Sequence, residues 1–75
     1  DLTPYVGAAF RHFREQAGMS QEQVALAAGL DRTYVSGIER SRRNPSLRSM
    51  QKVAAVLEID LAELLIKARE LAASS

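Results

Sequence analysis

Apolar residues recur along this chain at the spacing of an α-helix, and no alternating strand pattern competes with that period. We expect the first helix to be capped by Thr3, to carry Pro4 at its first helical position and to end at Gly18. Spacings of four, three and four residues mark its buried stripe, which comprises Val6, Phe10, Phe13 and Ala17. The chain is therefore expected to begin with an amphipathic helix.

The next two predicted helices are short and follow each other closely. Ser20 and Gln23 form a capping-box pattern at the start of the earlier one, which stops at Gly29. Asp31 is expected to cap the later one, which runs from about residue 32 to residue 39. The inward-pointing side chains of this pair are Val24, Ala25, Ala28, Val35 and Ile38.

Two further helices complete the pattern. A loop over residues 42–45 follows from Pro45, because the residue before a proline avoids the helical conformation. Ser46 then caps a fourth helix, and Asp60 with Glu63 opens a fifth, which frays from residue 72 onward. Their predicted apolar stripes are Leu47, Met50, Val53, Ala54 and Leu57, and then Leu61, Leu64, Leu65, Ala68 and Leu71. The sequence therefore predicts an all-α fold, a five-helix globule with short connections.

The length of the chain leaves room for one domain. With 75 residues and 8.2 kDa it can build one small core, which we place at about residues 4–72 of a single domain over residues 1–75. Hydrophobic residues make up 47% and charged residues 25%, which is typical of a globular rather than a disordered protein. Cysteine is absent and His12 is the only histidine, so we expect no disulfide, no metal site and no cofactor.

Neither end of the chain resembles a targeting or membrane segment. No apolar run is long enough for a transmembrane helix, and no signal peptide is recognisable. Asp1 in place of an initiating methionine indicates a trimmed chain or a fragment. We expect a cytoplasmic protein with no membrane partner.

The basic residues gather in the middle of the sequence. The net charge is only +1, and residues 1–31 and 53–75 each carry two basic against four acidic side chains. Residues 32–52 set six basic side chains against Glu39 alone, a net charge of +5, and the six are Arg32, Arg40, Arg42, Arg43, Arg48 and Lys52. A basic middle between mildly acidic ends favours a polyanion-binding surface over a merely solvated charged face.

Two short helices joined by a glycine-containing turn, over about residues 20–40, are typical of a helix-turn-helix motif. At about 100° per residue, Val35 and Ile38 define the buried direction of the second helix. The opposite face is short, polar and basic, and it consists of Thr33, Ser36, Gly37 and Arg40, flanked by Arg32. Gly37 would let another surface approach closely. We interpret this helix as a recognition helix for the major groove of DNA.

Residues beside the recognition helix are candidates for DNA phosphates. Gln21 lies at the N-terminus of the preceding helix, where backbone N–H groups favour an anion, although it could be a simple polar first-turn residue. The segment after the recognition helix is positioned for the adjoining phosphates through Arg40, Arg42, Arg43 and Asn44. Arg43 has a narrowed minor groove as its alternative target.

Four motifs, in order, resemble one family. They are GMSQEQVA at residues 18–25, AGL at 28–30, YVSGIER at 34–40 and NPSL at 44–47. Over about residues 4–66 the chain is similar to the XRE family, the phage repressor/Cro-like helix-turn-helix transcriptional regulators. Within that family, residues 30–40 most resemble the controller proteins of restriction–modification systems.

The resemblance implies base-contacting roles for three side chains of the recognition helix. Arg32, Thr33 and Ser36 match base-contacting positions of the family, and an arginine there can bond both major-groove acceptors of guanine. Tyr34 matches a position that touches DNA in the controller subgroup, with packing beneath the helix as the alternative.

The resemblance also implies a structural ion pair. Arg14 and Glu39 match positions that form a salt bridge between the first helix and the recognition helix. Each lies about 70° from the core direction of its helix, at the edge of the buried face. We therefore assign Glu39 a structural role, since a carboxylate facing DNA would repel it.

The expected partners are double-stranded DNA and a second copy of the chain. Helix-turn-helix proteins usually read two half-sites through two-fold symmetry. Val56 and Ile66 lie off the core stripes of the last two helices, and the candidate dimer interface is Val56, Ile59, Leu65 and Ile66. RNA polymerase is a further candidate partner.

The function predicted from these features is that of a sequence-specific transcriptional regulator. It would bind a palindromic or pseudo-palindromic operator as a homodimer, as a restriction–modification controller does. An antitoxin-type regulator, a prophage repressor and a protein-interaction module that retains the fold are the alternatives. An enzyme is the poorest interpretation, because the sequence offers no nucleophile–base pair, metal spacing or phosphate loop.

Overall fold

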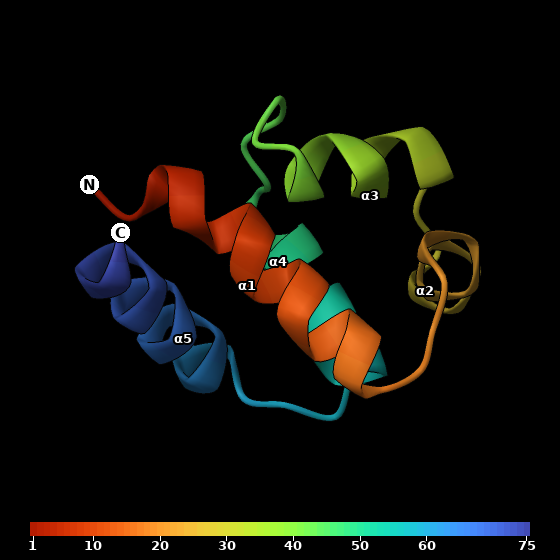
Figure 1. Cartoon of the computed structure of the whole chain (residues 1–75). Helices are drawn as coiled ribbons and strands as arrows, with labels where there is room; N and C mark the ends of the chain where they lie inside the picture. The colour runs from red at the N-terminus through yellow and green to blue at the C-terminus, as the bar shows by residue number, and fades with distance from the viewer.

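Five helices and no strand make up the computed structural model, which describes residues 1–75. They are α1 (Thr3–Gln16), α2 (Gln21–Ala28), α3 (Arg32–Glu39), α4 (Leu47–Val56) and α5 (Leu61–Ser74), so the predicted all-α architecture is confirmed. In Figure 1, α5 lies alongside α1 at one end of the molecule, while α2 and α3 lie toward the other end. None of these helices has the length and apolarity to cross a bilayer.

Local capping signals fix most of the helix starts. Ser20 and Gln23 form the predicted capping box, with hydrogen bonds of 3.0 and 2.8 Å between each side chain and the other's backbone. Asp31 caps α3 by accepting from the N–H of Thr33 at 2.9 Å. Gly29 ends α2 in the left-handed conformation, with φ of 69°. These short-range predictions are confirmed.

Both ends of the chain differ from the prediction. Leu2, not Thr3, is the N-cap of α1, because the carboxylate of Asp1 accepts the N–H of Thr3 at 3.0 Å and draws that residue into the helix. At the other end α5 continues to Ser74 instead of fraying from residue 72. The hydroxyl of Ser75 lies 2.6 Å from that of Tyr5, which joins the last turn of α5 to α1.

The core lies between α1, α4 and α5 and extends to α2 and α3. Its buried cluster consists of Ala9, Phe10, Val24, Ile38, Val53, Leu57, Leu64 and Ala68. Three residues predicted on core stripes are exposed instead: Ala17, Leu47 and Leu65. At 100° per residue, Leu47 lies about 100° from the mean direction of the buried residues of α4, and Leu65 about 80° from that of α5. Ala17 is the C-cap residue that follows the last turn of α1.

Gly7 allows α1 to cross the C-terminal end of α3 at close range. It is buried, and a Cβ placed on it would overlap the carbonyl oxygen of Ile38 and lie 2.9 Å from that of Glu39. Both obstructing groups are backbone, so no side chain could move aside. Sequence analysis did not single out Gly7, although a glycine inside a helical pattern is a recognised signal of close packing.

Candidate nucleic-acid interface

The position of α3 follows from the turn before it and from two buried side chains. Gly29 and the half-buried Leu30 turn the chain between α2 and α3. Val35 and Ile38, each 3% exposed, then hold the inner face of α3 against the core. Figure 1 shows α3 lying along the edge of the molecule, with its outer side clear of the other helices. This is the arrangement that a helix needs to enter a groove of DNA.

The N-terminal part of α3 presents polar side chains to solvent. Arg32 and Thr33 are exposed, and Ser36 is half-buried on the same outer side. The hydrogen bond at Thr33 uses its backbone N–H, so its hydroxyl stays available to an external partner. The three predicted base-contacting residues thus lie within the first five residues of α3.

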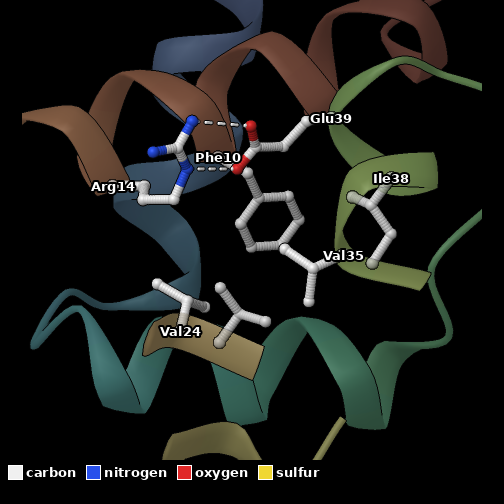
Figure 2. A pocket seen from close by; sticks show the side chains of 7 residues that line it. Phe10, Arg14, Val24, Val35, Ile38 and Glu39 are labelled. Carbon is white, nitrogen blue, oxygen red and sulfur yellow. Dashed lines mark hydrogen bonds and ion pairs between the residues drawn. The ribbon is translucent and has the colours of Figure 1, made fainter. Parts of the chain in front are cut away.

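A buried ion pair fastens α3 to α1 behind this face. Arg14 donates to both carboxylate oxygens of Glu39, with Nε–Oε2 of 2.6 Å and Nη2–Oε1 of 3.0 Å. Figure 2 shows the pair beside the ring of Phe10. The side chains are only 13% and 4% exposed, so they are more deeply buried than their predicted edge position implied. The hydrogen bond to Glu39 raises the pKa of Arg14 above its ordinary value.

Gln21 belongs to the same network. It is half-buried, and its amide nitrogen donates to Glu39 Oε1 at 3.1 Å, while Arg14 Nη1 donates to the carbonyl oxygen of Met19 at 2.9 Å. The network therefore joins α1, the start of α2 and the end of α3. This role of Gln21 was not predicted from the sequence, because no local pattern pairs it with a residue of the next helix. Its contact with a DNA phosphate stays a prediction.

Tyr34, on the flank of α3, packs against the start of α4, in line with the alternative interpretation that it is a packing residue. It is half-buried, and its hydroxyl donates to Ser49 and accepts the N–H of Ser46, both at 3.3 Å. The Ser49 hydroxyl and the Ser46 N–H can both stabilise the phenolate, which lowers the pKa of Tyr34. Tyr34 therefore ties α3 to the start of α4, and its contact with DNA stays a prediction.

The segment after α3 is exposed and basic. Arg40, Arg42, Arg43 and Asn44 are all exposed, as predicted for phosphate contacts. The guanidinium of Arg43 lies over the ring of Tyr34, 5.8 Å from its centroid. Gly37 is not open to an approaching surface, because a Cβ on it would lie 2.7 Å from Cγ of Arg43. The space that we expected a partner to use is filled by this arginine.

The exposed charges of residues 32–52 favour an anion. Six basic side chains on α3, the following segment and α4 are exposed: Arg32, Arg40, Arg42, Arg43, Arg48 and Lys52. Glu39 is the one acidic residue between them in the sequence, and its charge is compensated by Arg14. The Arg14–Glu39 pair is largely buried and neutral as a whole, so it adds little to the field at the surface. The exposed charge of residues 32–52 is therefore almost wholly positive. No group of acidic or histidine side chains there is arranged to hold a metal ion.

The four residues predicted for a dimer interface differ in exposure. Leu65 and Ile66 on α5 are 39% and 46% exposed. Val56 and Ile59 are half-buried and pack partly against the core. Of these four residues, only the two on α5 are exposed, and Leu26 on α2 and Leu47 on α4 are more exposed still, at 84% and 58%.

Three comparisons relate the chain to proteins already described. It is 43% identical over 70 residues to a hypothetical transcription factor of Neisseria meningitidis, spanning 93% of this chain and 66% of that protein. The restriction–modification controller protein C.AhdI from Aeromonas hydrophila superposes with a TM-score of 0.80 at 44% identity, covering 83% of this chain and 94% of that one. The clp gene regulator ClgR from Corynebacterium glutamicum gives a TM-score of 0.93 at 32% identity, covering 97% and 78%.

The family model described as Helix-turn-helix matches residues 10–64, which include all of α2, α3 and α4. That range contains the ion-pair network, the outer face of α3 and the basic segment that follows it. The relatives named above are a transcription factor, a controller protein and a gene regulator. The chain belongs to the XRE-type helix-turn-helix family of DNA-binding transcriptional regulators.

Proposed function

We propose that the chain binds a palindromic operator in double-stranded DNA as a homodimer, with α3 of each copy in the major groove. The observation that carries this proposal is the exposed polar end of α3, which is followed in the chain by the exposed basic side chains of Arg40, Arg42 and Arg43. Phosphate contacts fix the register of a protein on DNA, and base-edge contacts read the sequence. In this proposal the basic segment makes the phosphate contacts, and the start of α3 makes the base-edge contacts.

Arg32 is the principal base reader in this proposal. Its guanidinium fork fits the two acceptors of guanine in the major groove, while Thr33 and Ser36 offer hydroxyl groups to neighbouring base edges. Arg40, Arg42, Arg43 and Asn44 contact phosphates on either side. Because these residues come from two adjacent segments, one docking orientation can satisfy both sets.

Replacement of Arg32 by alanine is expected to relax specificity at one base pair in each half-site. The lost bidentate contact should remove about 1–3 kcal/mol of discrimination against the wrong base. Binding of the parent and Arg32→Ala to an operator and its single-base variants measures the effect. Arg69→Ala, an exposed arginine on α5, is the matched control and should leave the base preference unchanged. Equal weakening on every variant would assign Arg32 to a phosphate instead.

Dimer formation should bury Leu65 and Ile66. A two-fold dimer places its recognition helices about 34–36 Å apart, one turn of DNA. Ile66→Glu is expected to shift the monomer–dimer equilibrium toward monomer and to weaken operator binding, both measurable by analytical ultracentrifugation with and without DNA. Leu26→Glu, at a side chain that is 84% exposed on α2, is the control. A parent chain that stays monomeric and binds DNA one-to-one would contradict the dimer.

The controller function is the specific regulatory role that we favour. C.AhdI is matched over 94% of its length, so the likeness extends beyond the helix-turn-helix motif. Selection of bound sequences from random DNA, followed by a search for the selected site beside restriction or methylation genes, tests this role. A site beside a toxin gene or within prophage genes would support the antitoxin or prophage alternative. For a bacterial regulator of this kind we place the protein in the cytoplasm, with the DNA.

A further inference from the structure

Arg43 occupies the space beside Gly37 on the outer side of α3. A Cβ built on Gly37 would lie 2.7 Å from Cγ and 3.4 Å from Cβ of Arg43. The first separation is too short for two carbon atoms, so any other residue at position 37 would displace the arginine. The φ of Gly37 is not positive, and its backbone therefore has no need of glycine. What position 37 requires is the absence of a side chain.

Backbone contacts fix the point from which Arg43 reaches this space. The N–H groups of Arg42 and Arg43 both donate to the carbonyl oxygen of Gly37, at 2.8 and 3.1 Å. Ser41 turns the chain with a positive φ of 58°, and its hydroxyl donates to the carbonyl oxygen of Pro4 at 3.0 Å. The segment therefore folds back over the end of α3 and is attached to α1.

The far end of the Arg43 side chain meets an aromatic ring. Its guanidinium carbon lies 5.8 Å from the centroid of Tyr34, within the range of a cation–π interaction. The ring is held in turn, because its hydroxyl bonds to Ser46 and Ser49. Arg43 therefore contacts α3 at two points. Its Cβ and Cγ lie beside Gly37, and its guanidinium lies over the ring of Tyr34.

We propose that Gly37 and Tyr34 are positioning residues that hold Arg43 on the recognition surface before DNA is bound. Arg43 then acts as a side chain of that surface, although it belongs to the following segment. An arginine that is already ordered loses less rotational freedom on binding, and this raises affinity without any added contact. The inference rests on the proposed DNA-binding function.

A double-mutant cycle on operator DNA tests the coupling. Arg43→Ala, with one phosphate contact fewer, should bind about fivefold more weakly at 0.15 M salt and flatten the salt slope by about 0.9. Gly37→Ala should weaken binding by a similar factor, and the double variant should bind no more weakly than Arg43→Ala alone. Losses that multiply would show that position 37 acts on DNA independently of Arg43. Unchanged affinity in Gly37→Ala would also overturn the inference.

A measurement without DNA separates this inference from the proposed function. The δ-protons of Arg43 should be shifted upfield by the ring of Tyr34 in the NMR spectrum of the parent. The shift should disappear in Tyr34→Leu and in Gly37→Ala, while thermal unfolding of Gly37→Ala stays at or above that of the parent. If Gly37→Ala leaves the Arg43 signal unchanged, the inference is overturned but the proposed DNA-binding function is not. Failure of the parent to bind any DNA would overturn the proposed function and the DNA role of Arg43 with it.

Discussion

Replacing Glu39 with alanine is expected to lower the free energy of unfolding by about 3–5 kcal/mol. The carboxylate is 4% exposed and accepts hydrogen bonds from Arg14 and Gln21. Its removal would leave the guanidinium of Arg14 largely buried without a counterion, and a buried unpaired charge is costly. Because a domain of this size loses about 4–8 °C in Tm per kcal/mol, thermal unfolding should shift by roughly 12 °C or more.

An exposed ion pair of the same chemistry provides the control. Arg11 and Glu15 on α1 are bonded at 3.2 Å, but their side chains are 64% and 56% exposed. Glu15→Ala should therefore change stability by about 0.5 kcal/mol or less. Chemical denaturation of both variants compares the two sites directly. If Glu39→Ala destabilises no more than Glu15→Ala, the Arg14–Glu39 network does not fasten α3 to α1.

Replacing Gly7 with alanine is expected to cost about 3 kcal/mol, the upper end of what overpacking usually causes. The added Cβ would overlap the carbonyl oxygen of Ile38, and relief requires α1 and α3 to move apart. Separation would also strain the Arg14–Glu39 pair, which joins the same two helices. The predicted midpoint of denaturant unfolding is correspondingly lower, with an unchanged m-value.

Gly37→Ala is the matched control for Gly7→Ala. Both glycines lie within helices, but the Cβ at position 37 meets only the flexible side chain of Arg43. Since alanine is favoured over glycine in a helix by up to about 1 kcal/mol, Gly37→Ala should be neutral or stabilising. Equal stability changes in the two variants would mean that the α1–α3 contact at Gly7 is not tightly packed.

The parts of this fold that sequence analysis predicted well are those determined by neighbouring residues. The capping box at Ser20 and the turn at Gly29 each involve groups within a few residues of each other. Val35 and Ile38 likewise define one face of a single short helix, which is enough to identify the outer face of α3. The resemblance of ordered motifs added the pairing of Arg14 with Glu39, which no local pattern indicates.

The features that were missed depend on how segments distant in the sequence meet. Gln21 bonds to Glu39 only because α2 starts beside the end of α3. The relation of Gly37 to Arg43 requires the chain to fold back after α3. The exposure of Leu47 depends on which side of α4 faces α2 and α5, and that of Leu65 on which side of α5 faces α1. A stripe of apolar residues leaves that direction uncertain by one position.

If α3 and the basic segment after it form a DNA-binding surface, operator binding should weaken steeply as the salt concentration increases. Fluorescence anisotropy with duplex DNA selected for the parent chain gives the binding constant between 50 and 200 mM salt. With about 6–10 phosphate contacts in a dimer, affinity should fall by about 10³–10⁵ over that range, linearly on logarithmic axes. Absence of binding at low salt, or an affinity independent of salt, would show that these residues do not form a DNA-binding surface.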